Sequence, residues 1–409
     1  MIRHKHISKV MALSDQMIVS GTNFVIGILI TRLAGIEDYG RYSLYWMIFL
    51  FLLGFCNSFI GLPSQIISNQ VANKFEYLEE NNRLGNLSLT LLLFLLYTGF
   101  YIYDSLYSSS FGYGYWIFPM TIVIFLKQEM NRKYFYAKLD LKKVISIDFS
   151  AYLLQIPSLL ILTQFYDITL DLIITNITLF GIMGQVVFQF LKPRYNSPFR
   201  LKKMPYRENW SYSKHLIFTS ILQWFSGNIL IISAGGIIGL SAVGILRVLQ
   251  NIMGALHILF LTMENVIPVK ASILLNNHGK QHMFNYFKKV FVVAGIVYGI
   301  ILLVLKVSGE FLLSFLYGES YLEYSELLDL FIYLYILVFI GTIAQLIIKT
   351  LKLNYGISIA YALTVIAAFA ISTTLLNTFG IKGVILGLGI FQLITISTYL
   401  FIIKRNSIC

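Results

Sequence analysis

Twelve long apolar runs constrain the fold of this chain more than any other feature of its sequence. Each run has 15 to 24 residues, close to the length that a helix needs to cross the hydrocarbon core of a bilayer. The fourth run is the weakest, because it is short and contains two glycines and a proline. Only 12% of the residues are charged, against about 25% in a soluble domain. We therefore predict an all-α integral membrane protein. The runs cover residues 11–31, 44–62, 87–103, 112–126, 144–162, 170–191, 215–238, 245–268, 290–306, 327–348, 354–377 and 383–403.

The basic residues support this number of crossings. If the N-terminus lies in the cytoplasm, the cytoplasmic segments hold 26 of the 31 Lys and Arg residues, half of them in the predicted loops 127–143 and 192–214. Cytoplasmic loops of membrane proteins carry such an excess of positive charge. One crossing more or fewer would destroy the alternation. We therefore predict about twelve transmembrane helices, with both termini in the cytoplasm. The net charge of +12 then faces the inner leaflet, and nucleic acid is not expected as a partner.

The segments between the runs exclude several functions. No Gly-rich phosphate-binding loop is present, so the chain is not expected to hydrolyse ATP. Two histidines, His278 and His282, have the i, i+4 spacing of metal ligands, but no acidic third ligand accompanies them. The cysteines, Cys56 and Cys409, suggest neither a disulfide nor a metal site. Basic residues precede the first run as in a signal peptide, but no cleavage site follows, so we expect a retained helix. The sequence predicts a protein that is not an enzyme and has no metal or cofactor.

A repeated pattern divides the twelve runs into six and six. The segment Gly35–Gly40 has the pattern G-[IL]-x-x-[YV]-G, which recurs 204 residues later in Gly239–Gly244. Pro63 is matched by Pro268, and the polar pair Thr22 and Asn23 by Ser226 and Asn228, at nearly the same offset. We predict an N-lobe over residues 1–191, a basic cytoplasmic linker over 192–214 and a C-lobe over 215–409. Two six-helix lobes of equal orientation would be related by a pseudo-two-fold axis along the membrane normal, as in alternating-access transporters.

Three of these segments resemble a known family. "TRLAGIEDYGRYSL" (residues 31–44) is similar to the hairpin between the first two helices of bacterial polysaccharide flippases, which has the pattern R-L-x-G-x-x-[DE]-Y-G-x-Y-x-L. "SAVGILRVLQNI" (241–252) and "FLYGESY" (315–321) resemble segments of the second half of these proteins. The chain thus resembles the O-antigen (Wzx-type) branch of the multidrug/oligosaccharidyl-lipid/polysaccharide (MOP) exporter superfamily, which has a MATE-like fold.

The resemblance implies a substrate, partners and a location. The substrate would be an undecaprenyl-diphosphate-linked oligosaccharide of the O-antigen or capsule type, moved from the cytoplasmic to the outer leaflet of the bacterial inner membrane. Membrane lipids, a polysaccharide polymerase and a chain-length regulator would be its partners. Two alternatives stay open: a multidrug or cation exporter of the same superfamily, and a membrane-embedded polysaccharide polymerase. The former would need an acidic cavity, and the latter usually has a basic outer loop, whereas the longest outer segment here, 307–326, is acidic.

Candidate site residues lie mainly in the eighth run. Ionisable residues inside a membrane are costly and usually face a cavity. Arg247, Gln250, Gly254, His257, Leu261 and Glu264 follow one another in steps of three and four, so they share one helical face about 25 Å long. On this face we expect Arg247 and Gln250, with the adjacent Asn251, to bind substrate. The other interpretation is that Arg247 and Glu264 extend to the two interfaces, and that His257 is hydrogen-bonded within the bundle.

Further candidates lie in the first half of the chain. Arg32, Arg41 and Asn57 are additional candidates for substrate binding. For ion coupling we name His257 and Glu264, since histidine titrates near neutral pH, together with Asp15 and Asp148. The two aspartates lie near cytoplasmic ends of their runs, which favours the interpretation that they are solvated.

Overall fold

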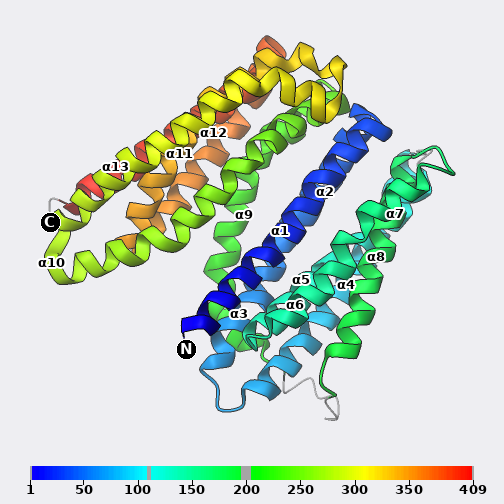
Figure 1. Cartoon of the computed structure of the whole chain (residues 1–409), viewed down its shortest axis with the longest axis horizontal. Helices are drawn as coiled ribbons and strands as arrows, with labels where there is room; N and C mark the ends of the chain where they lie inside the picture. The colour runs from blue at the N-terminus through cyan, green and yellow to red at the C-terminus, as the bar shows by residue number, and fades with distance from the viewer. Residues whose placement is uncertain (1, 108–111, 195–203, 408–409) are drawn as a thin grey trace. The chain divides into compact units, whose positions relative to one another are not determined.

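The first half of the chain folds into helices with short interruptions. The structure is a computed structural model that describes residues 2–107, 112–194 and 204–407, and no strand occurs in this part of the chain. Polar and apolar residues alike are helical here, because a backbone in hydrocarbon must satisfy its own hydrogen bonds. The elements are α1 (Ile2–Leu33), α2 (Ile36–Cys56), π-helical turn η1 (Asn57–Gly61), α3 (Leu62–Ile66), 3-10 turn η2 (Ile67–Asn69), α4 (Lys74–Tyr107), α5 (Tyr113–Ala137), α6 (Leu141–Asp148), π-helical turn η3 (Phe149–Leu153), α7 (Gln155–Leu162) and α8 (Leu170–Leu191) (Figure 1).

The second half consists of fewer, longer helices. They are α9 (Tyr206–Ile237), α10 (Leu240–Tyr317), 3-10 turn η5 (Glu319–Tyr324), α11 (Ser325–Thr350), α12 (Tyr355–Phe379) and α13 (Ile381–Ser407). In the described part of the chain, ten helical segments are long and apolar enough to cross a membrane. This set counts α10 once and omits α5. The prediction of an all-α, multi-pass membrane protein is confirmed.

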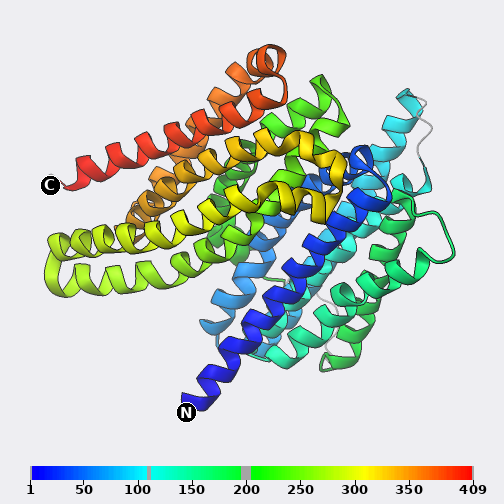
Figure 2. The ribbon, with the colours of Figure 1, turned by 45° about the horizontal axis from the view of Figure 1, so that its top comes forward.

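In helix α10 the chain reverses at a single glycine, instead of over the long loop that the apolar runs predicted. We expected a loop over residues 269–289, but both sides of Gly279 are helical, so this expectation is wrong. At Gly279 the backbone has φ 81° and ψ 178°, a conformation that residues with a Cβ rarely adopt. The single glycine therefore lets the chain reverse between two helical arms, as Figure 2 shows in yellow-green.

The chain forms two compact units. Unit 1 contains residues 1–34 and 45–221, and unit 2 contains residues 35–44 and 222–409. Helices α2 and α9 therefore each contribute to both units. Of the predicted linker 192–214, residues 195–203 lie outside the described residues. Its last part is not a linker, because α9 begins at Tyr206 and Asn209 is fully buried in unit 1.

In unit 1, α5 packs against α4, α6 and α8. Glycines permit the close approach of α8, since a Cβ built at Gly181 would lie 2.6 Å from a side-chain carbon of Ile124, and one at Gly184 would lie 2.7 Å from the Cβ of Ala151. Small residues at helix interfaces are typical of membrane bundles. A buried apolar cluster that includes Tyr134, Phe135 and Phe188 contributes to the core of the unit.

Two helices of unit 1 extend beyond their apolar runs. We expected loops over residues 63–86 and 127–143, but α4 already begins at Lys74 and α5 continues to Ala137. The extensions carry buried polar residues, among them Glu79, Asn81 and Arg132. Asn81 donates hydrogen bonds to the Ile60 carbonyl and the Ser64 hydroxyl, and it accepts one from Asn209. Hydrogen bonds between polar side chains within the bundle thus stabilise the parts of these helices that extend beyond the apolar runs.

In unit 2, the two copies of the repeated glycine pattern contact each other. A Cβ built at Gly40 would lie 2.0 Å from the Leu240 carbonyl oxygen, and one at Gly244 would lie 2.3 Å from the Ile36 carbonyl oxygen. Gly40, the last glycine of the first copy, thus lies against Leu240 of the second copy, and Gly244 of the second copy lies against Ile36 of the first. The first glycines, Gly35 and Gly239, have positive φ angles of 93° and 124° and separate the helices before and after them. The two copies of the pattern therefore form a reciprocal contact between their backbones.

Candidate functional site

Arg247 lies on the first arm of α10 and is half-buried. Its guanidinium donates hydrogen bonds to Gln250 Oε1 at 2.6 Å and to Asn228 Oδ1 at 3.2 Å. Both partners are neutral amides, and within the described residues no carboxylate forms an ion pair with Arg247. A half-buried cation that is balanced only by neutral dipoles is well suited to bind an anion.

Gln250 connects Arg247 to a cavity within unit 2. The cavity has a volume of 370 Å³ and is enclosed by α9, α10, α11, α12 and α13. Amide and hydroxyl groups dominate its polar surface, and no charged residue lines it among those that the structure describes. The glutamines of this lining are Gln223, Gln250, Gln345 and Gln392, and the tyrosines are Tyr335, Tyr361 and Tyr399.

The other predicted substrate residues are not gathered at this cavity. The Asn251 amide donates a hydrogen bond to the Tyr317 hydroxyl at 2.9 Å, which connects the two arms of α10. Arg41 is exposed and pairs with Asp38 at 3.1 Å on the same helix, and Arg32 is exposed at the end of α1 in unit 1. Asn57, in the π-helical turn of unit 1, lies over Gly61, where a Cβ would come within 2.7 Å of its Oδ1. Substrate binding by these residues stays a prediction.

The predicted pair of His257 and Glu264 is described only in part. Both belong to α10, but the side chain of His257 lies outside the described residues. Glu264 is half-buried and forms an ion pair with Lys349 of α11, with 3.4 Å between the carboxylate oxygen and the ammonium nitrogen. Lys349 therefore already compensates the charge of Glu264.

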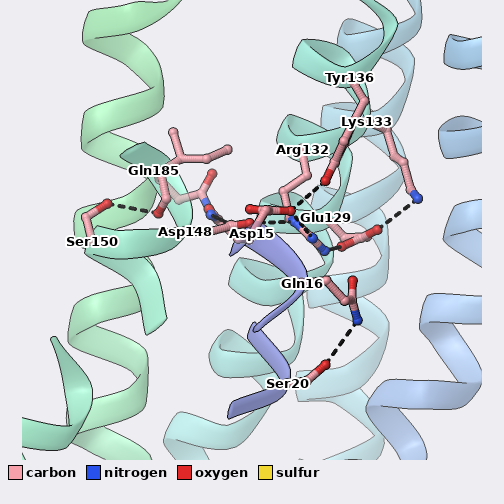
Figure 3. Close-up of polar contacts among 12 residues, drawn as sticks. Asp15, Gln16, Ser20, Glu129, Arg132, Lys133, Tyr136, Asp148, Ser150 and Gln185 are labelled. Atoms are coloured by element: carbon pink, nitrogen blue, oxygen red, sulfur yellow. Dashed lines mark hydrogen bonds and ion pairs between the residues drawn. The ribbon is translucent and has the colours of Figure 1, made fainter. Parts of the chain in front are cut away.

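Asp15 and Asp148 meet in a buried charge cluster of unit 1 (Figure 3). Both aspartates are fully buried, so the interpretation that they are solvated is wrong. Arg132 of α5 joins them: its Nη2 lies 2.7 Å from Asp15 Oδ2, and its Nε lies 2.6 Å from Asp148 Oδ2. The third nitrogen, Nη1, lies 2.6 Å from Glu129 Oε2. One guanidinium thus holds three carboxylates from α1, α5 and α6.

Neutral groups complete the cluster. Tyr136 donates a hydrogen bond to Asp15 at 2.6 Å, and Gln128 donates one to Asp148 at 2.8 Å. Lys133 pairs with Glu129 at 3.3 Å. Three carboxylates thus face two cations, which leaves one formal negative charge in excess. The carboxyl groups of Asp15 and Asp148 are also within hydrogen-bonding reach of each other, so one proton shared between them would remove the excess.

The sequence analysis missed Arg132 because it placed residue 132 in a loop. A signal was nevertheless present in the sequence. Phe118, Ile122, Phe125, Gln128, Arg132 and Phe135 follow one another in steps of three and four, so the helical face of the fourth run continues for about two and a half turns beyond residue 126. In the structure all six are buried.

Solved structures with the same fold define the class of protein. The chain is similar to an inward-facing multidrug resistance MATE family transporter of the MOP superfamily, with a TM-score of 0.75, 11% identity, and coverage of 96% of this chain and 94% of that one. It is also similar to the lipid II flippase MurJ in an inward closed conformation, with a TM-score of 0.70, 13% identity, and coverage of 97% and 87%. A third structure, a MOP superfamily transporter from Pyrococcus furiosus, has a TM-score of 0.64, 13% identity, and coverage of 98% and 94%.

The chain therefore has the fold of MOP superfamily transporters, which confirms the resemblance to this superfamily that was inferred from its sequence, while the O-antigen branch stays a prediction. Residues 29–326 match the model of a family described as polysaccharide biosynthesis protein. The chain belongs to this family. No curated protein is similar enough in sequence to count as a match.

Proposed function

We propose that this protein is a flippase that moves an undecaprenyl-diphosphate-linked oligosaccharide from the cytoplasmic to the outer leaflet of the bacterial inner membrane. The observation that carries the proposal is Arg247, a half-buried cation whose hydrogen-bond partners among the described residues are neutral, next to a polar cavity that no described charged residue lines. A diphosphate would supply the missing negative charge, and a guanidinium matches phosphate oxygens with two parallel donors. Membership in the polysaccharide biosynthesis family supports the same substrate class.

The alternatives receive less support from the described residues. A cation exporter would need carboxylates that are free to face a substrate. However, the buried carboxylates Asp15, Glu129 and Asp148 are held by Arg132, and Glu264 pairs with Lys349. A polysaccharide polymerase would need catalytic groups in an outer segment, and η5 with its flanks carries acidic residues instead.

Transport in proteoliposomes tests the proposal directly. Vesicles that contain the purified protein should make an undecaprenyl-diphosphate-linked oligosaccharide from the inner leaflet accessible to a membrane-impermeant glycosidase added outside. Vesicles without protein should not. The same vesicles should not accumulate or release a lipophilic cationic dye. Dye transport without lipid flipping would favour the multidrug exporter.

The orientation in the membrane gives a separate prediction. Asn277 lies near the reversal of α10, and Glu323 lies in η5; both are exposed. If the termini are cytoplasmic, Asn277→Cys should react with an impermeant maleimide only from the cytoplasmic side, and Glu323→Cys only from outside. Cys409 is first replaced by serine, and Cys56 is buried. Labelling of both positions from one side would contradict the twelve-helix topology.

Ion coupling gives another prediction, for which we favour Asp15 and Asp148 as the proton site. Their cluster has one negative charge in excess and places the two carboxyl groups within hydrogen-bonding reach. Asp148→Asn should leave the protein folded but abolish the response of lipid flipping to an imposed pH gradient. His257→Asn and Glu264→Gln test the other predicted pair. A normal response in Asp148→Asn would remove the aspartates from the coupling mechanism.

A further inference from the structure

We propose that the cavity in unit 2 binds an uncharged sugar, namely the sugar residue of the lipid-linked oligosaccharide that is nearest to the diphosphate. The proposal rests on the proposed function and adds a sugar class and a position to it. Gln250 sets the position, because its side chain accepts a hydrogen bond from Arg247 and also lines the cavity. A diphosphate bound at Arg247 would therefore place the first sugar at the cavity.

The chemistry of the lining fits hydroxyl groups. Sugar hydroxyls both donate and accept hydrogen bonds, and so do the glutamine amides and tyrosine hydroxyls of the cavity. An acidic sugar would bring a carboxylate into a space where no described lining residue carries a positive charge. Burial of an unpaired charge is strongly unfavourable. The cavity therefore favours neutral sugars over uronic acids.

Several polar groups in the cavity have capacity for a ligand. The amides of Gln345 and Gln392 donate long hydrogen bonds, each of 3.4 Å, to the Tyr361 hydroxyl and the Leu337 carbonyl. The Tyr399 hydroxyl is buried near Gln345 but makes no hydrogen bond of normal geometry. Buried polar groups are almost always hydrogen-bonded, so the Tyr399 hydroxyl needs water or a ligand as a partner, and the two half-buried amides have room for a shorter hydrogen bond to the same ligand.

Size and access are also compatible with one sugar residue. A volume of 370 Å³ lies at the lower end of the range for ligand pockets, about 300–1,000 Å³. Phe331 and Phe391 contribute apolar surface for the C–H faces of a sugar ring. Gln223 and Gly227, both on α9, are lining residues that are exposed, so the opening lies along this helix.

Gly227 offers a way to fill the cavity without disturbing the fold. A Cβ built there meets no atom within 4 Å, so a leucine can enter the space that the sugar would occupy. Gly236 is a matched control: it lies on the same helix, a Cβ there also meets no atom within 4 Å, and it does not line the cavity. Both substitutions replace a helical glycine and should favour the helix slightly.

The test measures binding to the full-length protein in nanodiscs. Three probes are compared: undecaprenyl diphosphate with one neutral hexose, with one hexuronic acid, and without a sugar. The wild type should bind the neutral form about tenfold more tightly than the other two, which corresponds to about 1.4 kcal/mol. Gly227→Leu should bind the neutral form no better than the bare lipid, whereas Gly236→Leu should retain the preference. Gln392→Leu, which removes an amide without filling space, should lose part of it.

The outcomes separate this proposal from the proposed function. Equal binding of all three probes by the wild type, or an unchanged preference in both Gly227→Leu and Gln392→Leu, would overturn the sugar site and leave the flippase intact. No binding of any probe would overturn the flippase itself. If sodium binds in the cavity and no sugar-bearing probe competes with it, the cavity is a cation site instead. If Gly227→Leu does not fold, the preference for the neutral sugar is measured in Gln392→Leu and Gln345→Leu instead, and an unchanged preference in both would overturn the sugar site.

Discussion

Replacement of Arg132 by methionine should lower the free energy of unfolding by about 3–5 kcal/mol. The guanidinium is only 7% exposed and pairs with three carboxylates, two of which are fully buried. Methionine fills a similar volume but leaves these carboxylates without their shared partner, and an unpaired buried charge is costly. Unfolding of the purified protein, followed by heat or denaturant, measures the loss.

Two further variants isolate the cause of this effect. Lys382→Met removes an ion pair with Glu326 that is as short, at 2.6 Å, but exposed, and it should cost less than about 1 kcal/mol. Asp148→Asn in the Arg132→Met background removes one of the unpaired charges and should restore part of the stability. Equal losses in Arg132→Met and Lys382→Met would show that the buried cluster does not stabilise the fold.

Lipid flipping should fall to background in Arg247→Ala, while the protein stays in the membrane. The variant removes the cation that we assign to the diphosphate, and each hydrogen bond to a charged group contributes about 1.5–3 kcal/mol. Loss of two such bonds corresponds to more than a hundredfold in affinity. Arg247→Lys keeps the charge but loses the planar pair of donors, so it should retain part of the activity.

The controls for Arg247 address charge and position. Arg207→Ala removes an exposed cation from α9 and should flip lipid as the wild type does. Normal flipping by Arg247→Ala would show that this side chain has a structural role only. If Arg247→Ala is lost from the membrane fraction, Arg247→Gln takes its place in the test, because glutamine can still hydrogen-bond Asn228 but carries no charge.

The spans could be predicted from the sequence because a chain in the hydrocarbon core must be helical and must be long enough to cross the bilayer. The apolar runs fall within helices, ten segments of which are long and apolar enough to cross a membrane, but the helix ends were not predicted, because hydropathy reports only the part of a helix that contacts lipid. The polar extensions of α4 and α5 are held by contacts with residues far apart in the sequence, such as Arg132 with Asp15. The helical arms on both sides of Gly279 were missed for a similar reason, since their polar residues resembled a loop.

The site was predictable only where its residues share one helix. Arg247 and Gln250 are three residues apart, so helical spacing predicts their contact, and the structure contains it. Gln345 and Gln392 reach the same cavity from α11 and α13, and Gln223 reaches it from α9. No local pattern in a single sequence reports such a convergence of distant helices.

The reciprocal contact of Gly40 and Gly244 has a consequence for how this chain can evolve. At each glycine the atom nearest to a built Cβ is a backbone carbonyl oxygen of the other copy, that of Leu240 or Ile36, and at Gly244 side-chain carbons of Ile36 lie close as well. A change of side chain at the partner position therefore cannot make room for a larger residue at either glycine. Only a separation of the two helices could do so, and it would break the second contact as well. A larger residue at either glycine would therefore disturb both contacts at once, so the two positions constrain each other and behave as a single structural unit.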